Sequence, residues 1–277
     1  MTVASGGRLK GRLALITGAS RGLGAALAKR FAAEGAHVIL TARTPGGLEE
    51  VDDEIRRTGG EPATLLPFDL RELDKIDQVG AAIRQRFGRL DVLIGNAAVL
   101  GKLSPLGHLD PKSWDEVMVV NLTANWRLIR SLDPLLRSSD AGRAIFVTCA
   151  AAHDMAAYWG AYAVSKAGLE TLARIYAREL AITGATANLV DPGIMATALR
   201  LRAFPGEDRA KLAAPESRTE AFIALAEAGS ARNGELVSAV PRHVSTQEDP
   251  DAMVSDPGCG ARPARDCRAG RPLDPLS

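Results

Sequence analysis

The chain has 277 residues, of which 46% are hydrophobic and 24% are charged, and its formal net charge at pH 7 is +1. This composition is typical of a globular protein that is long enough to bury one large core. Because the charges nearly balance, no excess of basic residues is available for a polyanion, and we expect no nucleic acid among its partners.

Short aliphatic runs alternate with longer amphipathic segments along the chain. Seven runs predict β-strands: Leu13–Ile16, Val38–Thr41, Ala63–Phe68, Leu90–Gly95, Ala144–Thr148, Ala185–Val190 and Glu235–Val240. The runs are apolar on both faces and are joined by helix-length segments, which is typical of parallel strands buried between two layers of helices. We therefore predict an α/β fold, a doubly wound parallel sheet of about seven strands with helices on both faces.

Residues 1–240 are predicted to form one domain of this kind. Residues 241–277 are rich in Pro, Arg, Asp and Gly and show no sustained period. Such a segment buries too little apolar surface to order itself, so we predict a disordered tail.

No apolar stretch approaches the roughly 20 residues that span a bilayer, and residues 1–11 lack the apolar core of a signal peptide. We therefore expect a cytoplasmic protein without membrane partners. Three cysteines, Cys149, Cys259 and Cys267, are too few and too far apart for a disulfide framework or a four-ligand zinc site. We expect no bound metal.

A glycine-rich turn follows the first predicted strand. It reads Thr17-Gly18-Ala19-Ser20-Arg21-Gly22-Leu23-Gly24, and a helical pattern runs from Ala25 to Glu34. Glycines let the backbone approach a ligand closely, and the free N–H groups at a helix N-terminus favour a pyrophosphate. The strand, turn and helix together predict a Rossmann-like dinucleotide site, whereas the glycine pattern alone also fits a simple tight turn. The predicted ligand contacts are Gly18, Ser20, Arg21, Gly22, Leu23 and Gly24.

The end of the second predicted strand favours NADP(H) over NAD(H). An acidic residue there would bind the ribose hydroxyls of NAD, but the chain has Thr41-Ala42-Arg43 and no carboxylate until Glu49. Arg43 and Arg21 are instead suited to a 2′-phosphate, because the planar guanidinium binds phosphate oxygens in a bidentate way. The alternative is that both are solvated surface arginines.

A tyrosine and a lysine lie four residues apart at the start of a long helical segment. In Tyr162-Ala163-Val164-Ser165-Lys166 the two side chains would share a helix face. An ammonium near a phenol favours the phenolate, so the pair predicts a tyrosine with a lowered pKa that acts as an acid–base catalyst.

These motifs together resemble the short-chain dehydrogenase/reductase family, in order and spacing, from about Leu9 to Val240. The resemblance rests on the glycine turn, Asp69, Asn96-Ala97, Asn121, the Tyr162 and Lys166 pair, and Pro192-Gly193-x-x-x-Thr197. It implies that Tyr162 is the proton donor in reduction, that Lys166 lowers its pKa and binds the nicotinamide ribose, and that Asn121 holds a relay water. It further implies cofactor contacts from Asp69, Leu70, Asn96, Ala97, Pro192, Gly193 and Thr197.

One position departs from the family pattern. Thirteen residues before the tyrosine, where the family has a serine that binds the substrate carbonyl, this chain has Cys149. A thiol is the weaker donor. Thr148 carries a hydroxyl, but neighbours on a strand face opposite sides, so it would substitute only at a bulge.

We therefore expect an NADP(H)-dependent carbonyl reductase, with a catalytically weakened or silent NADP(H)-binding protein as the alternative. The resemblance further implies a small-molecule substrate under a lid formed by residues 194–215. This lid would suit an apolar ketone or an acidic one. The long helices around Ser113–Arg137 and Ala161–Thr183 predict a homodimer or homotetramer, because such helices pair across a two-fold axis in relatives.

Overall fold

The computed structural model describes residues 7–240, which build one seven-stranded sheet. Its strand order is β3-β2-β1-β4-β5-β6-β7, and every neighbouring pair is parallel. The strands are β1 (Leu13–Thr17), β2 (His37–Ala42), β3 (Thr64–Pro67), β4 (Val92–Gly95), β5 (Arg143–Val147), β6 (Thr186–Asp191) and β7 (Leu236–Ser238). Each predicted strand overlaps one of these, and the predicted fold is confirmed.

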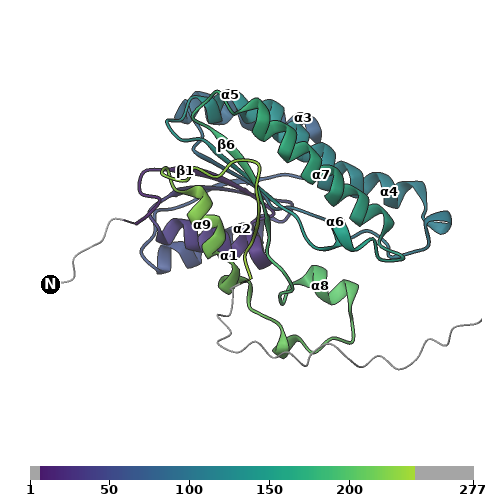
Figure 1. Cartoon of the computed structure of the whole chain (residues 1–277). Helices are drawn as coiled ribbons and strands as arrows, with labels where there is room; N and C mark the ends of the chain where they lie inside the picture. The colour runs from purple at the N-terminus through teal and green to yellow at the C-terminus, as the bar shows by residue number, and fades with distance from the viewer. Residues whose placement is uncertain (1–6, 241–277) are drawn as a thin grey trace, which may run out of the picture. The chain divides into compact units, whose positions relative to one another are not determined.

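Helices cover both faces of the sheet (Figure 1). One face carries α1 (Gly22–Ala33), α2 (Pro45–Arg57) and α9 (Glu220–Ala226), and the other carries α3 (Leu73–Phe87), α5 (Ala124–Arg137) and α7 (Gly160–Glu179). The shorter helices are α4 (Pro111–Met118), α6 (Ala151–Asp154) and α8 (Ala198–Ala203), and the 3-10 turns are Leu106–His108, Arg209–Lys211 and Pro215–Arg218.

The two helical layers explain why the strands are apolar on both faces. Along β1, Leu15 packs into the core under α3, α5 and α7, while its neighbour Ile16 packs into the core under α1, α2 and α9. Both side chains are fully buried. Burying one such side chain contributes about 1.5–3 kcal/mol, so each strand supports both layers at once.

The order of the strands reverses beside β1. Strands β1, β2 and β3 follow one another toward one edge, and the chain then crosses over so that β4 pairs with the other side of β1. In a sheet of this kind the crevice at such a switch point, outside the carboxyl ends of the strands, is where ligands bind. The fold therefore places a candidate site above β1 and β4.

The helical segment predicted around Ser113–Arg137 is present but is not uniform. Between α4 and α5, residues Val119–Thr123 form a π-helix, which the apolar periodicity did not indicate. Single π turns inside α-helices often mark functional sites, and Asn121 lies in this one.

The predicted disordered tail, residues 241–277, lies outside the described residues, as do Cys259 and Cys267. Within residues 7–240 no helix combines the length and the apolar character needed to cross a membrane. The same residues contain no cluster of three or more His, Cys, Asp or Glu side chains suited to a metal ion.

Candidate active site

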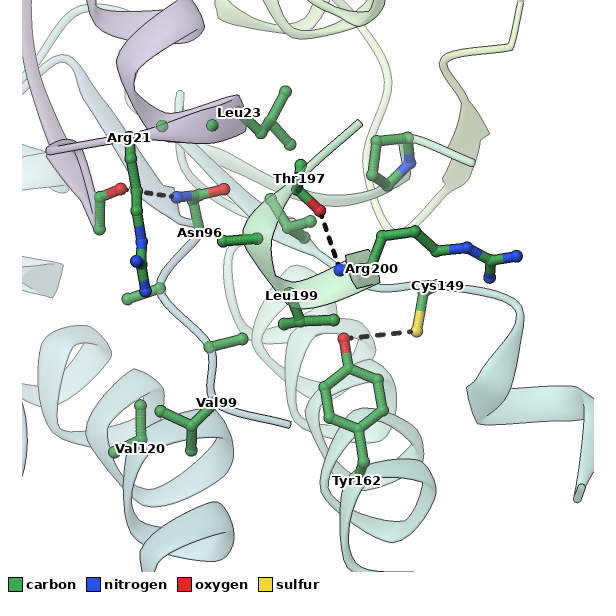
Figure 2. A pocket seen from close by; sticks show the side chains of 18 of the residues that line it. Arg21, Leu23, Asn96, Val99, Val120, Cys149, Tyr162, Thr197, Leu199 and Arg200 are labelled. Atoms are coloured by element: carbon green, nitrogen blue, oxygen red, sulfur yellow. Dashed lines mark hydrogen bonds between the residues drawn. The ribbon is translucent and has the colours of Figure 1, made fainter. Parts of the chain in front are cut away.

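A cavity of about 760 Å³ lies at the carboxyl ends of the strands. Its walls come from the turn after β1, the segments after β2 to β6, and α8 (Figure 2). The predicted cofactor-binding residues all line it: Gly18, Ser20, Arg21, Gly22, Leu23, Gly24, Arg43, Asp69, Leu70, Asn96, Ala97, Pro192, Gly193 and Thr197. Cys149, Tyr162 and Lys166 line it as well, so the structure brings the two predicted groups to one cavity.

The glycine turn after β1 packs tightly against the end of β4. Gly18 and Gly22 have positive φ angles of 67° and 56°. A Cβ atom on Gly24 would collide with the carbonyl oxygen of Gly18 and with the side-chain amide of Asn96. Helix α1 begins at Gly22, three residues before the predicted start, so the N–H groups of its first turn belong to the turn itself. This bare backbone is a cradle that fits a pyrophosphate.

The hydroxyl of Thr17 joins the ends of β1 and β4. It donates to the carbonyl oxygen of Ile94 over 3.1 Å and accepts from the backbone N–H groups of Asn96 and Ala97 over 3.0 and 3.1 Å. The side-chain amide of Asn96 donates in turn to the carbonyl oxygen of Thr17 over 2.8 Å. The predicted contacts Asn96 and Ala97 are thereby fixed beside the glycine turn.

Two exposed arginines stand at the end of the cavity that β2 delimits. Arg21 and Arg43 line the cavity, and no carboxylate follows β2 there. Asp69, the predicted adenine contact, accepts hydrogen bonds from the backbone and side chain of Arg71. Partial burial opposes ionisation of Asp69, but the hydrogen bonds from Arg71 outweigh it and hold its pKa below the ordinary value.

The predicted acid–base pair is buried at the opposite end of the cavity. Tyr162 is 6% exposed and Lys166 is 2% exposed, and both belong to α7. The Lys166 ammonium donates to the carbonyl oxygen of Val147 over 2.8 Å and lies 5.8 Å from the centre of the Tyr162 ring. The Lys166 ammonium therefore lies over the Tyr162 ring.

The pKa of Tyr162 differs from the sequence expectation. Burial raises the pKa of the hydroxyl well above its usual value of about 10, and the neighbouring Cys149 adds to the increase. Burial also lowers the pKa of the Lys166 ammonium. In this arrangement Tyr162 is held protonated, which is the form that a proton donor needs.

Cys149 occupies the predicted position beside the tyrosine. Its Sγ lies 3.8 Å from the Tyr162 hydroxyl oxygen (Figure 2). The hydroxyl of Thr148 is directed elsewhere, because it donates to the buried carboxylate of Glu170 over 2.8 Å. No bulge brings Thr148 into the role of the missing serine.

Asn121 is the one predicted site residue that does not line the cavity. It is fully buried, and its side-chain amide donates to the carbonyl oxygen of Val99 and to the hydroxyl of Ser165, both over 3.0 Å. Its side-chain oxygen accepts from the N–H of Val99 over 2.9 Å. Asn121 thus fixes a cavity-lining residue and the helix turn that precedes Lys166.

Sequence reasoning missed an aromatic group at the tyrosine end. The ring of Trp159 lies 5.9 Å from that of Tyr162 in an edge-on arrangement, and 5.9 Å from that of Phe204. Trp159 precedes the tyrosine by one helical turn, a spacing that would have indicated proximity. Phe204 belongs to the predicted lid, residues 194–215, but its contact with Trp159 depends on tertiary packing and could not be predicted from spacing.

A doubly wound sheet with a glycine turn at its switch point is the architecture of dinucleotide-dependent enzymes. The family model for short chain dehydrogenases matches residues 12–208, and the chain belongs to this family of nicotinamide-dependent oxidoreductases.

Several relatives resemble this chain over most of its length. The uncharacterized oxidoreductase YciK of Escherichia coli K12 is 36% identical over 209 residues, which are 75% of this chain and 82% of that protein. The 3-oxoacyl-[acyl-carrier-protein] reductase FabG of the same strain is 32% identical over 74% of this chain and 82% of its own length. A short chain dehydrogenase from E. coli CFT073, solved in complex with NADPH, superposes with a TM-score of 0.81 at 34% identity and covers 84% of this chain and 98% of its own.

Proposed function

We propose that the protein is an NADP(H)-dependent oxidoreductase that interconverts a carbonyl and an alcohol, with Tyr162 as the acid and base. The observation that carries the proposal is a single cavity with two arginines at one end and the buried Tyr162 hydroxyl at the other. The NADPH complex of a relative and the name of the FabG reductase support the cofactor and the reaction type.

The residues of the cavity fit a dinucleotide. The cradle at Gly18 and Gly24, which a Cβ atom would fill, suits the pyrophosphate, and Arg21 and Arg43 suit a 2′-phosphate. Asp69, Leu70, Asn96 and Ala97 would hold the adenosine half, and Pro192, Gly193 and Thr197 the nicotinamide half. When bound, the cofactor supplies or accepts the hydride.

The proton is handled by the protein. Tyr162 donates the proton of its hydroxyl to the carbonyl oxygen of the substrate, and the raised pKa keeps that proton available at neutral pH. Cys149 lies next to the Tyr162 hydroxyl and orients the carbonyl oxygen of the substrate through its S–H group, which is a weaker donor than a serine hydroxyl. Lys166 stabilises the phenolate left behind, while Asn121 acts as a positioning residue behind Val99 and α7; its predicted relay water stays a prediction.

A second candidate is a weakened or silent NADP(H)-binding member of the family. Cys149 favours it, since a thiol is a weaker hydrogen-bond donor than the serine hydroxyl that the family has at this position. Turnover of a carbonyl compound by the purified chain would refute the silent form of this candidate, and a native rate equal to that of Cys149→Ser would refute the weakened form.

The proposal is tested by titrating the protein with NADPH and NADH and then following NADPH absorbance with a panel of ketones and aldehydes. We expect tighter NADPH binding and measurable turnover. Tyr162→Phe should abolish turnover and leave NADPH affinity nearly unchanged, because only the acidic proton is removed. Full activity of that variant would overturn the assignment of Tyr162.

Two further expectations belong to this proposal. A homodimer or homotetramer is expected from the long helices α5 and α7, and light scattering that shows only monomer would contradict it. A cytoplasmic location and a small-molecule substrate fit the proposed use of NADPH.

A further inference from the structure

The end of the cavity that holds the Tyr162 hydroxyl has an aromatic wall. Trp159, at the N-cap of α7, meets Tyr162 edge-on and packs against Phe204, which follows α8. All three side chains line the cavity, and Trp159 is only half-buried. Ring faces and edges at such separations are suited to contact a further ring.

The rest of this end is mostly apolar. The residues that complete it are Ala150, Ala151, Ala156, Ile194, Leu199 and Ala203. Figure 2 shows Leu199 of α8 at the same part of the cavity as Tyr162. Ile194 remains 55% exposed, so apolar surface extends to the entrance.

The cation nearest to this wall is already engaged. Arg200 forms two hydrogen bonds with the carboxylate of Glu207, over 2.6 and 2.7 Å, and its guanidinium carbon stacks 3.7 Å from the centre of the Phe204 ring. Figure 2 shows its side chain extending away from Tyr162. The carboxylate of Asp154 also lines the cavity and is exposed. The Lys166 ammonium is buried and already donates to the carbonyl oxygen of Val147. An anionic substrate would therefore meet a paired arginine, a buried lysine that is already hydrogen-bonded, and the like charge of Asp154.

We propose that this site selects neutral carbonyl compounds that carry a ring, and that Trp159 and Phe204 are the residues that select them. The inference rests on the proposed function for the reaction, but the preference itself is a property of binding. The sequence of the lid left two alternatives, an apolar ketone and an acidic one. The contacts of Arg200 with Glu207 favour the apolar ketone.

Four α-keto compounds test the effect of the ring and the effect of the negative charge independently: ethyl benzoylformate, benzoylformate, ethyl pyruvate and pyruvate. The affinity of each is measured by calorimetry on the full chain, with and without saturating NADP⁺, and turnover is measured with NADPH. We expect ethyl benzoylformate to bind about tenfold more tightly than ethyl pyruvate, because aromatic contacts add to its burial, and about tenfold more tightly than benzoylformate.

Matched variants assign the preference to residues. Trp159→Leu should weaken ethyl benzoylformate about five- to tenfold and leave ethyl pyruvate unchanged, while Trp159→Phe should retain most of the ring preference. Trp114→Leu is the control, because Trp114 is also half-buried but does not line the cavity. Glu207→Gln should release Arg200 and raise the affinity for benzoylformate relative to its ester.

The outcomes separate this inference from the proposed function. Ring-selective binding without turnover would overturn the proposed reaction and support the preference. Equal affinity for ethyl benzoylformate and ethyl pyruvate, binding of none of the four, or a preference that survives unchanged in Trp159→Leu would overturn the preference, whatever the turnover.

Discussion

Replacing Cys149 by serine tests how much the thiol limits catalysis. An oxyanion-type donor is worth about 10²–10³ in kcat, or about 2.7–4 kcal/mol. Cys149 lies beside the reacting hydroxyl, with its sulfur 3.8 Å from the Tyr162 oxygen, but a thiol is a weak donor. We therefore take the transition-state stabilisation by the thiol as about half of that by a hydroxyl. About 1.4–2 kcal/mol is then recoverable, which corresponds to a gain of roughly 10- to 30-fold in kcat.

The assay is the initial rate of NADPH oxidation at saturating cofactor with ethyl benzoylformate, for the native chain, Cys149→Ser and Cys149→Ala. The serine variant should be fastest and the alanine variant slowest, with little change in NADPH affinity, because the position lies at the tyrosine end of the cavity. A serine variant no faster than the native chain would refute the reasoning, since the thiol would then not be limiting.

Three other expectations follow from the cavity. Replacing Arg21 and Arg43 together by alanine should weaken NADPH about ten- to hundredfold and leave NADH nearly unchanged in fluorescence titrations, and an equal loss for both cofactors would contradict the 2′-phosphate contact. Because the pKa of Tyr162 is raised, its acidic form persists as pH rises, so kcat for reduction should stay flat from about pH 6 to about pH 9. A fall in that rate near neutral pH would show that the pKa is lowered instead. Gly24→Ala should lower both thermal stability and NADPH affinity, because its Cβ atom would collide with the carbonyl of Gly18, and a variant with native cofactor affinity would contradict the cradle.

The sheet could be predicted because its information is local. Strands such as β1 and β5 are apolar on both faces, and only a strand between two helical layers has that pattern. The π-helix at Val119–Thr123 was not predictable in this way. One extra residue in a turn changes which side of the helix Asn121 faces, and apolar periodicity over a longer window does not detect it.

In the candidate site, too, local motifs could be predicted and tertiary contacts could not. The glycine turn and the spacing of Tyr162 and Lys166 are contiguous motifs, so the cavity-lining residues were readily found. The contact of Lys166 with the carbonyl oxygen of Val147 and the pairing of Arg200 with Glu207 depend on tertiary packing. Burial and the neighbouring Cys149 raise the pKa of Tyr162, and the pairing of Arg200 with Glu207 sets the charge at the substrate end of the cavity. Neither effect was predictable from spacing.

The three hydrogen bonds of the Thr17 hydroxyl have a consequence for the kinetics of the cofactor. They hold together the segments that follow β1 and β4 through protein groups alone. The conformational entropy of these segments is therefore lost when the chain folds and not when the dinucleotide binds. Association of the cofactor should accordingly be fast and limited by diffusional encounter. Thr17 variants should lose affinity because the segments after β1 and β4 would be less ordered and would have to be ordered at each binding event.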